Sequence, residues 1–481
     1  MVFSSPIFLF WFLPAVLFTY AVLDRRLKNF FLLLGSLFFY AWGEPTFVLI
    51  MLGSILGNYL FGLGIGRASG LRRRKLALGL GVTFNLAMLA AFKYANFLAD
   101  NLNVVWTRLG GAAFEVDPVP LPLGISFFTF QAMSYVIEVY KGEVSSQKNP
   151  ITLALYISLF PQLIAGPIVR YHDIARELTN RSVRLQDAVD GVRRFVVGLG
   201  KKVLIANPLG AVADQIFAIP PDQVPTSFAW LGVVCYALQI YFDFSGYSDM
   251  AIGLGRLFGF HFLENFNYPY ISQSITEFWR RWHISLSTWF RDYLYIPLGG
   301  DRRGRARTYF ILVLVFFLCG LWHGANWTFV VWGLFNGAFL VIERAGFGAV
   351  LERLPRAVRH GYVVLVFLTA WVFFRSETIG GALLYLRAMF LGGGELPYTP
   401  LYLLSNDVLA VLAVGIVAST PIALKAAESV REWQSRTERP ATVLLGRLAE
   451  VAALPIVSGI FLLSAARLAS GTYNPFIYFR F

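Results

Sequence analysis

The sequence predicts an all-α, polytopic integral membrane protein. Apolar residues make up 57% of its 481 residues, charged residues only 14%, and the mean hydropathy is +0.60. A chain of this composition has too little polar surface to cover itself in water. Its many apolar runs approach bilayer length, which predicts on the order of eleven or twelve helical crossings of about 20 residues each. The runs are continuously apolar instead of alternating, which disfavours a β-barrel.

The charge pattern orients the first spans. The first apolar run, Pro6–Leu23, has no basic residue before it and no clear cleavage site after it, so we expect it to remain as a span and not to act as a signal peptide. Basic clusters at Arg25–Lys28 and Arg72–Lys75 follow the first and third runs, and Glu44 lies between the second and third. Because Lys and Arg gather in cytoplasmic loops, the N-terminus is expected outside. The same rule accounts for the net charge of +13, so nucleic acid is not expected as a partner.

The next runs follow the same alternation until the sequence is broken by proline. Leu76–Leu98 and Leu121–Tyr140 are separated by an acidic, polar segment that we expect outside. From Pro161 to Pro167, two prolines and a glycine interrupt an apolar run, which favours a re-entrant or interfacial segment. Non-helical backbone at membrane depth persists only where protein or a water-filled cavity surrounds it, so the fold is expected to enclose a chamber.

The sequence predicts a single membrane-embedded domain over residues 1–481, and further spans follow the proline break. After a run beginning near Phe228, the polar and aromatic region Glu264–Arg307 is ambiguous. The later apolar runs are Tyr309–Gly320, Trp327–Ile342, Tyr362–Phe374, Val408–Leu424 and Val451–Leu463.

Among the five histidines, His323 is the strongest candidate for chemistry. It lies between two apolar spans, where an ionisable side chain is costly and usually faces an interior cavity. Imidazole accepts a proton near neutral pH. The alternative is a structural histidine packed against Trp322 or Trp327. His172 and His360 lie in basic loop sequence and are expected at the surface.

The other polar candidates are less specific. His261 is expected to be an interfacial side chain bonded to backbone. Cys235 and Cys319 lie inside apolar runs, where a small buried side chain is a commoner role than a nucleophile. The sequence shows no metal-ligand cluster of useful spacing, no glycine-rich phosphate loop and no serine-nucleophile elbow, so no metal site is expected.

His283 lies in a segment dense in aromatic and basic residues. If Glu277–Tyr293 forms one helix, Trp279, Trp282 and His283 share a face, as they also would in an interfacial amphipathic helix. Arginines follow the segment at positions 302, 303, 305 and 307. Their guanidinium groups could grip the phosphates of a nucleotide-bearing donor, although positive-inside anchoring explains them equally well.

A third constellation is Tyr241–Met250, which carries Asp243, Ser245 and Asp249 beside a membrane run. Its carboxylates could orient a histidine. Helix capping by Asp243 and Ser245 is an equally good explanation.

Together these segments resemble the membrane-bound O-acyltransferase (MBOAT) superfamily and, within it, the alginate O-acetyltransferase (AlgI) type. The resemblance covers essentially the whole chain, and its other carriers are Met1–Ser5, Leu121–Gly142, Glu264–Gly300, Leu321–Trp327 and the aromatic ending Asn474–Phe481. It implies a helical fold with a tunnel between the two membrane faces. It also implies that His323 is the signature histidine, acting as general base, and that His283 is the second, more variable polar position, which helps to place or polarise a reactant.

The resemblance further implies a donor, partners and a location. Acetyl-CoA is expected as the cytoplasmic donor substrate, with no tightly bound cofactor, in a multi-pass protein of the cell inner membrane. An exported polysaccharide such as alginate is the expected acceptor, reached through a periplasmic or membrane-anchored relay protein. The expected substrate-binding residues are Asp243, Ser245, Trp279, Arg280, Arg281, Trp282, Ser287, Arg291, Tyr295, Trp322 and Asn326.

Two alternatives remain open from the sequence. One is O-acetylation of peptidoglycan or another secreted glycan, since the histidines do not identify the acceptor; a D-alanyl transferase for teichoic acid fits less well. The other is a transporter of an acyl donor or lipid, which broken helices would also suit. Transporters commonly have related halves, and this chain shows no such repeat.

Overall fold

The computed structural model describes residues 1–436, 440–471 and 473–475, and every regular element within these ranges is a helix. The helices of the first half are α1 (Leu13–Val22), α2 (Lys28–Gly43), α3 (Val48–Arg67), α4 (Leu71–Leu89), α5 (Ala95–Arg108), α6 (Ile125–Lys141), α7 (Pro150–Ser158), α8 (Phe160–Leu163), α9 (Tyr171–Thr179), α10 (Leu185–Gly200) and α11 (Asn207–Phe217). The helices of the second half are α12 (Thr226–Leu257), α13 (Ile275–Arg281), α14 (Ile284–Phe290), α15 (Arg305–His323), α16 (Trp327–Ile342), α17 (Gly348–Arg353), α18 (Arg356–Arg375), α19 (Ile379–Leu391), α20 (Asn406–Ala418), α21 (Ile422–Arg436) and α22 (Pro440–Ala469).

Short π-helical or 3₁₀ segments join several of these helices. The π-helical segments are η1 (Phe8–Phe12), η2 (Ala90–Tyr94), η3 (Lys201–Ala206), η5 (Arg291–Tyr295) and η7 (Glu343–Phe347). The 3₁₀ turns are η4 (Pro269–Ile271), η6 (Gly300–Arg303) and η8 (Pro400–Leu403). The segments η2, η3, η5 and η7 each carry charged side chains. Single π-helical turns often lie at functional sites.

The prediction of an all-α membrane protein is confirmed, but the described chain has fewer long spans than predicted. Seven described helices are long and apolar enough to cross a membrane, or eight if the bent pair Asn406–Ala418 and Ile422–Ser429 is one span. Three shorter apolar helices accompany them. Eleven or twelve crossings were predicted because the count included apolar runs that fold as short or broken helices. Examples are the 16-residue α2 and the 17-residue α6.

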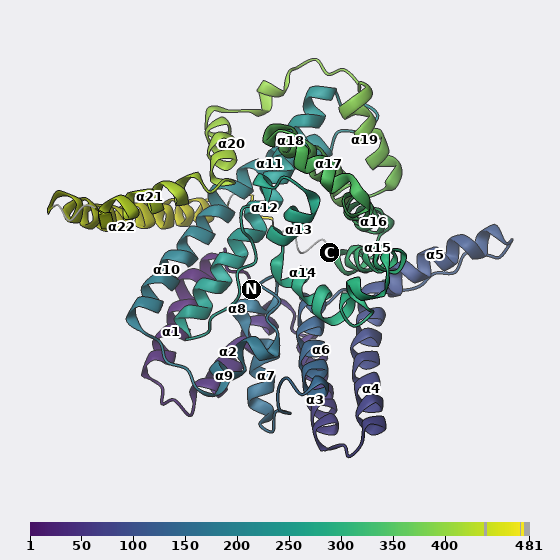
Figure 1. Cartoon of the computed structure of the whole chain (residues 1–481), viewed down its shortest axis with the longest axis vertical. Helices are drawn as coiled ribbons and strands as arrows, with labels where there is room; N and C mark the ends of the chain where they lie inside the picture. Colours follow the sequence, from purple (N-terminus) through teal and green to yellow (C-terminus); the bar gives the residue numbers. More distant parts are fainter. Residues whose placement is uncertain (437–439, 472, 476–481) are drawn as a thin grey trace.

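Helix α12 is the axis of the molecule, and α10 packs closely along it (Figure 1). The two helices approach through glycines. A Cβ at Gly198 of α10 would lie 2.5 Å from the Gly246 carbonyl oxygen of α12, and one at Gly253 would lie 2.6 Å from the Gly191 carbonyl oxygen. Small residues are what allow helix backbones to approach this closely in a bilayer, where no hydrophobic effect drives helices together.

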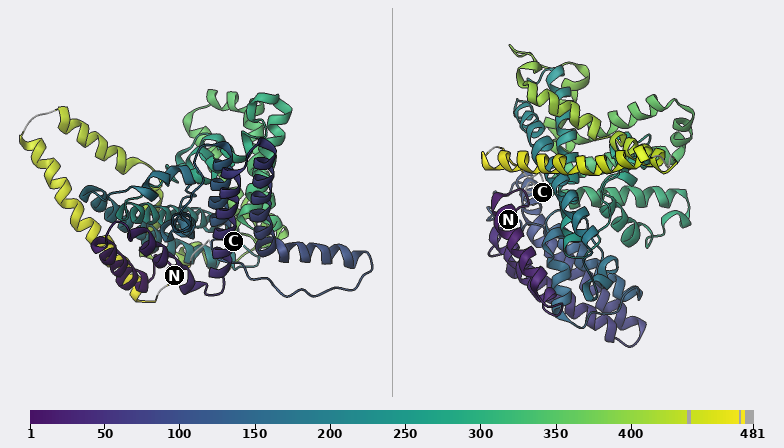
Figure 2. Two further views of the ribbon diagram at one scale, coloured as in Figure 1. Left: turned by 90° about the horizontal axis from the view of Figure 1, so that it is seen from below. Right: turned by 90° about the vertical axis from the view of Figure 1, so that its left-hand side faces the viewer.

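The helices α3, α4 and α6 form a bundle at one end of the molecule (Figure 1). Buried Asn58 and Asn85 hydrogen-bond to each other across α3 and α4, at 3.1 and 2.7 Å. Two elements project from the body. The α21–α22 hairpin extends to one side, and α5 extends to another (Figures 1 and 2).

Each of the first two basic loops is anchored to a neighbouring part of the fold. Tyr20 donates to the Phe258 carbonyl at 2.8 Å, and Asn29 donates to the Leu178 carbonyl at 2.7 Å. These contacts join the helices that flank the first basic loop to the residue after α12 and to the last turn of α9. The second basic loop, through Arg74, similarly bonds the last carbonyls of α6, including that of Tyr140 at 2.8 Å.

The break predicted at Pro161–Pro167 is confirmed. Helix α7 ends at Ser158, the four-residue α8 follows, and residues 159–169 are buried among the helices. The region Glu277–Tyr293 is not one helix, however, since α13 and α14 are separate and meet at Trp282 and His283. Trp282 and His283 are both buried. Helices α13 and α14 lie near the middle of the view in Figure 1.

Candidate active site

His323 is the last residue of α15, at the sharp turn into α16. The helix ends there because Gly324 adopts an extended backbone, and α16 starts afresh with Asn326, whose side chain accepts from the Thr328 N–H at 3.0 Å. The imidazole is only 4% exposed and lies against the rings of Trp332 and Phe374, with centroids at 5.0 and 5.3 Å. Neither of its ring nitrogens has a hydrogen-bond partner within the described residues. A buried polar atom normally has a partner, so these nitrogens are available to a substrate.

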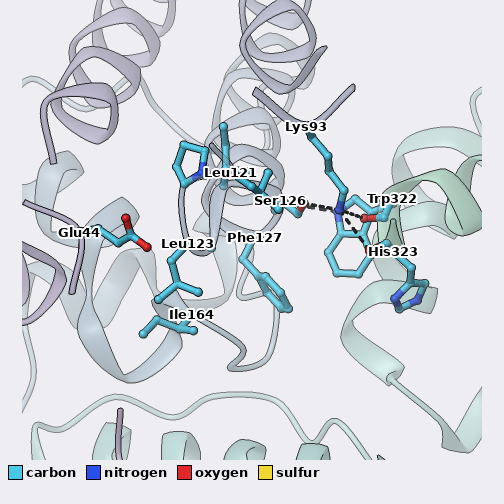
Figure 3. Close-up of a pocket in the computed structure, with 12 residues that line it drawn as sticks. Glu44, Lys93, Leu121, Leu123, Ser126, Phe127, Ile164, Trp322 and His323 are labelled. Atoms are coloured by element: carbon cyan, nitrogen blue, oxygen red, sulfur yellow. Dashed lines mark hydrogen bonds between the residues drawn. The ribbon is translucent and has the colours of Figure 1, made fainter. Parts of the chain in front are cut away.

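Lys93 secures the carboxyl end of α15. Its buried ammonium donates to Ser126 Oγ at 3.0 Å, to the His323 carbonyl at 3.3 Å and to the Trp322 carbonyl (Figure 3). The last carbonyls of a helix lack partners within the helix and carry partial negative charge, so a cation placed there is stabilising. Lys93 was not predicted as a site residue. Its signal was a lone charge inside the apolar run 76–98.

His283 is fully buried and has a left-handed backbone, with φ 45° and ψ 54°. Its ring lies 6.3 Å from that of His323 and 5.9 Å from that of Trp322, between centroids. Its Nδ1 lies 3.2 Å from Oδ1 of Asn265, while Nε2 has no partner in the part of the chain that the structure describes. The two histidines predicted as catalytic therefore share one buried space, although 40 positions separate them in the sequence.

Two cavities approach this histidine pair. The first, the Glu44 cavity, has a volume of about 130 Å³ and is lined by His323, Trp322, Lys93, Glu44 and the segment 121–127 (Figure 3). The second, the Arg193 cavity, has a volume of about 680 Å³, and its lining includes Arg193, Arg256, Ser248 and Asn265. Asn265 in turn touches His283. The pair thus lies between one cavity on the predicted outer side and one beside the predicted cytoplasmic loops.

The carboxylates of α12 do not contact either histidine in the interactions that the structure gives. Asp243 pairs with Lys202 at 2.6 Å, and both side chains are buried. Asp249 pairs with Lys201 at 2.6 Å and with Arg194 at 2.9 Å. Capping by Asp243 and Ser245 was the wrong alternative, because both lie in the middle of α12. Ser245 instead lines the Arg193 cavity.

The predicted aromatic residues gather around the histidines. Trp322 contacts both imidazoles, and Trp279 donates to Asn336 at 3.2 Å and lies edge-on to Trp332. Trp282 lies 5.0 Å from Trp371, which stacks on Trp332 beside His323. These rings surround the two imidazoles.

The predicted arginines and the remaining polar residues lie further out. Arg280 lines a separate cavity of about 670 Å³ beside Arg344. Arg281 pairs with Glu277 at 2.9 Å and Arg291 with Asp292 at 2.7 Å. The hydroxyl of Tyr295 contacts Asp301, that of Ser287 lies 3.5 Å from the Trp282 carbonyl, and Asn326 caps α16. Their substrate-binding role remains a prediction.

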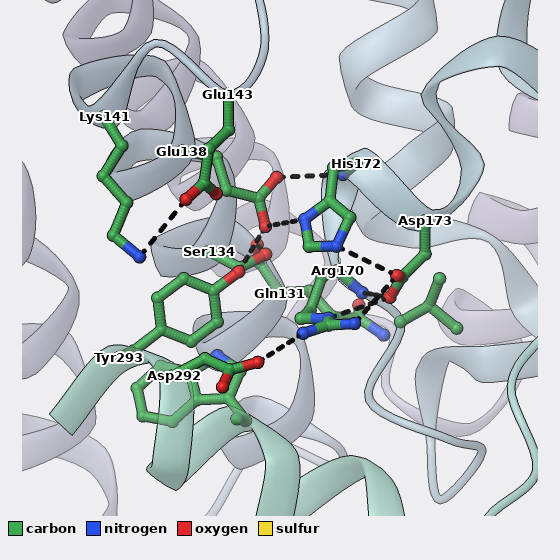
Figure 4. A network of polar contacts seen from close by, with 12 residues as sticks. Gln131, Ser134, Glu138, Lys141, Glu143, Arg170, His172, Asp173, Asp292 and Tyr293 are labelled. Carbon is green, nitrogen blue, oxygen red and sulfur yellow. Dashed lines mark hydrogen bonds and ion pairs between the residues drawn. The ribbon is translucent and has the colours of Figure 1, made fainter. Parts of the chain in front are cut away.

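A polar network ties α6 and α9 to the segment after α14 (Figure 4). Buried Glu138 accepts from the His172 backbone and lies 2.9 Å from His172 Nδ1, while Arg170 bridges Asp173 and Asp292. Hydrogen bonds to Asp173 and then to Glu138 raise the pKa of His172 to about 10. The expected surface histidine is therefore a partly exposed, paired cation.

One group in this network has metal-ligand geometry. Ligand atoms of Glu138, Glu143 and His172 lie within 4.8 Å of one another. The same atoms are engaged in ion pairs, since Glu143 pairs with Lys141 at 3.5 Å and Glu138 with His172. The structure thus gives each of these three residues an ion pair.

Comparison with known proteins identifies the family of this chain. The sequence pattern of the membrane-bound O-acyltransferase family matches residues 92–374, which include both histidines, Lys93 and Asn265. A probable alginate O-acetylase AlgI of Pseudomonas putida is 43% identical, and that of Pseudomonas aeruginosa 41%, each over 100% of both chains. A peptidoglycan O-acetyltransferase of Helicobacter pylori is 38% identical over 81% of this chain and 80% of its own. The chain belongs to the membrane-bound O-acyltransferase family, and within it to the AlgI type.

Proposed function

We propose that this multi-pass O-acyltransferase takes acetyl from cytoplasmic acetyl-CoA and passes it across the inner membrane for O-acetylation of an exported polysaccharide, with alginate as the acceptor. The similarity to alginate O-acetylases over the full length supports the acceptor. The observation that carries the chemistry is the buried pair of imidazoles, 6.3 Å apart between two cavities, with both His323 nitrogens available.

The proposed reaction is a direct transfer. The oxygen of an acceptor hydroxyl attacks the thioester carbonyl carbon, and His323 takes the hydroxyl proton as the new C–O bond forms. The C–S bond then breaks, and the proton passes from His323 to the departing thiolate. His283 places or polarises a reactant. Cys235 and Cys319 are buried in the helix bundle and are not proposed as acyl carriers.

The donor is proposed to enter through the Arg193 cavity. Its lining combines Arg193 and Arg256 with the aromatic rings of Tyr241 and Phe266. Guanidinium groups bind phosphates by bidentate hydrogen bonds, and CoA carries phosphates. The acceptor, or the relay protein that carries acetyl to the polysaccharide, is proposed to meet the enzyme at the Glu44 cavity.

The test is acetyl transfer by the purified protein in liposomes. Radiolabelled acetyl-CoA and a hydroxyl acceptor would be supplied. If no acetyl-CoA is consumed, the relay protein would be added. We expect His323→Ala to lower turnover by about 10²- to 10⁴-fold. His261→Ala, at a half-exposed histidine remote from the pair, is the matched control and should retain wild-type turnover. Normal turnover of folded His323→Ala would contradict the assignment.

Peptidoglycan is the second candidate acceptor. The 38% identity to a peptidoglycan O-acetyltransferase over 81% of this chain favours it as a specific alternative. Supplying alginate and peptidoglycan fragments separately in the same assay distinguishes the two. Preferential acetylation of the peptidoglycan fragment would replace the first acceptor with the second and leave the catalytic proposal intact.

A further inference from the structure

Asn265 forms hydrogen bonds to the turn that contains His283. Its backbone carbonyl accepts from the Ile284 N–H at 2.9 Å, and its side-chain Oδ1 accepts from the Ser285 N–H at 3.2 Å. These are the first two N–H groups of α14, which have no partner within the helix. A left-handed backbone at a residue other than glycine is strained and persists only where surrounding contacts impose it. Asn265 supplies those contacts to His283.

The amide of Asn265 has only one consistent orientation. A backbone N–H can only donate, so the atom that faces the Ser285 N–H must be the amide oxygen and not the nitrogen. The nitrogen then faces Ser248 Oγ, at 3.1 Å. The Ser285 hydroxyl accepts from the Ile168 N–H at 3.0 Å, which leaves its own hydrogen to be donated to Asn265 Oδ1 at 2.9 Å. The whole cluster therefore presents Oδ1 as an acceptor.

This orientation decides which nitrogen of His283 carries the proton. Nδ1 lies 3.2 Å from Oδ1 and 3.5 Å from Ser285 Oγ, whose single hydrogen is directed to Oδ1 at the shorter distance of 2.9 Å. Two acceptors would not face each other at these distances. Nδ1 must therefore donate. In the neutral ring the proton is then on Nδ1, and Nε2 holds a lone pair. The ring contacts Phe244 and Trp322 in a fully buried site, where a charged imidazolium would be costly.

We infer that Asn265 is a positioning residue that holds His283 in the Nδ1–H tautomer, so that Nε2 accepts a hydrogen bond from an O–H or N–H group of a bound reactant. This inference rests on the proposed function and deepens it. A thioester carbonyl is itself an acceptor, so neutral His283 does not polarise it. The two possible donors are a hydroxyl of the acceptor and an amide N–H of the acetyl-CoA arm. His283 thus places a reactant, while His323 takes the proton.

The first test reads the tautomer directly. The chain has only five histidines, so ¹⁵N-histidine labelling gives a simple NMR spectrum, and His283→Gln identifies the His283 signals. We expect a protonated Nδ1 and an unprotonated Nε2 in the wild-type protein. In Asn265→Leu we expect this pattern to be lost, and in Asn265→Asp, which keeps an oxygen opposite Nδ1, we expect it to remain. A proton on Nε2 in the wild type would overturn the inference, and so would an unchanged tautomer in Asn265→Leu.

The second test separates positioning from folding. Asn265→Leu should lower kcat about ten-fold or more, since partners that orient an active-site imidazole typically contribute 10- to 100-fold. Asn85→Leu is the matched control: it removes an equally buried amide from the α3–α4 pair, far from the histidines in sequence and packing. Equal losses in the two variants would mean a general packing effect and would contradict the inference.

The kinetic constants also identify the reactant that His283 contacts. If KM for the hydroxyl acceptor rises in Asn265→Leu while KM for acetyl-CoA does not, Nε2 binds the acceptor hydroxyl; the reverse assigns it to the donor's amide. Should the wild type show the Nδ1–H tautomer but no acetyl transfer with any acceptor, the proposed function fails and the positioning role of Asn265 stands. If Asn265→Leu does not fold, the spectra of the wild type and of Asn265→Asp still show which nitrogen of His283 carries the proton.

Discussion

Lys93 shows how one buried side chain can hold the proposed catalytic base in place. Its three ammonium hydrogens match three acceptors, two of which are the last carbonyls of the helix that ends in His323. Lys93→Met should free the end of α15 and lower stability by about 2 kcal/mol, because hydrogen bonds to charged groups contribute roughly 1.5–3 kcal/mol. Acetyl transfer should fall at least ten-fold as His323 loses its fixed position.

The measurement for Lys93 is a thermal unfolding curve in detergent together with the acetyl-transfer assay. Lys148→Met, at an exposed position in a loop, is the control and should leave both unchanged. Unaltered activity of Lys93→Met would show that α15 holds His323 without this side chain.

His172 gives the protein a pH-dependent stabilisation. Its pKa is about 10 in the folded protein, owing to hydrogen bonds to Asp173 and Glu138, against an ordinary value of 6.5. The folded state therefore binds this proton more tightly, and the stabilisation is fully present below about pH 6.5 and is lost as pH rises towards 10. Unfolding temperatures of wild type and His172→Gln should differ at pH 6 and converge by pH 10. A difference that grows with pH would refute this.

The sequence identified the two histidines but not the residues that hold them. His323 and His283 were found because histidine is rare in apolar and aromatic sequence. Asn265 offered no comparable signal, since asparagine is common in loops, and its role arises only when residues 265–267 fold back onto residues 281–284. Lys202 follows a strongly basic stretch of sequence, and in the structure it pairs with Asp243 inside the bundle.

At the scale of helices, the contact between α10 and α12 depends on glycine. Gly198→Ala should destabilise the protein, because the added Cβ would lie 2.5 Å from the Gly246 carbonyl oxygen and 2.8 Å from the Met250 backbone nitrogen. Neither is the end of a flexible side chain, so the helices must separate, at a cost of about 1–3 kcal/mol. Gly64→Ala in α3 is the matched control, since its Cβ would meet nothing within 4 Å. Equal unfolding temperatures for the two variants would count against this packing.

Helix existence was predictable, and helix interruption was predictable only where proline causes it. Continuous apolar runs predicted α3, α12, α15, α16 and α18, because burying a helix in lipid needs only composition and length. The break at Pro161 was also visible, since proline cannot continue a helix. The break at His283 was not, because it depends on hydrogen bonds that the Ile284 and Ser285 N–H groups donate to Asn265, which is distant in sequence.

For the whole molecule, the charge rule predicts that the N-terminus lies outside and that the basic loops lie in the cytoplasm. If the N-terminus is outside, the Glu44 cavity opens to the periplasm and the Arg193 cavity to the cytoplasm. Such an arrangement lets a cytoplasmic donor and an external acceptor reach the histidine pair from opposite faces, without either crossing the bilayer.

Cysteine accessibility tests that orientation. Cys235 and Cys319 are buried and would be replaced by alanine, and single cysteines placed at Glu44 and Arg193. A membrane-impermeant maleimide should label Glu44→Cys in spheroplasts with an intact inner membrane, and Arg193→Cys only after the membrane is opened. Acetyl-CoA should then protect Arg193→Cys but not Glu44→Cys, because the donor occupies only the cytoplasmic cavity. The opposite labelling would invert the topology, so that the donor would have to enter through the Glu44 cavity, where Lys93 is the cation beside His323.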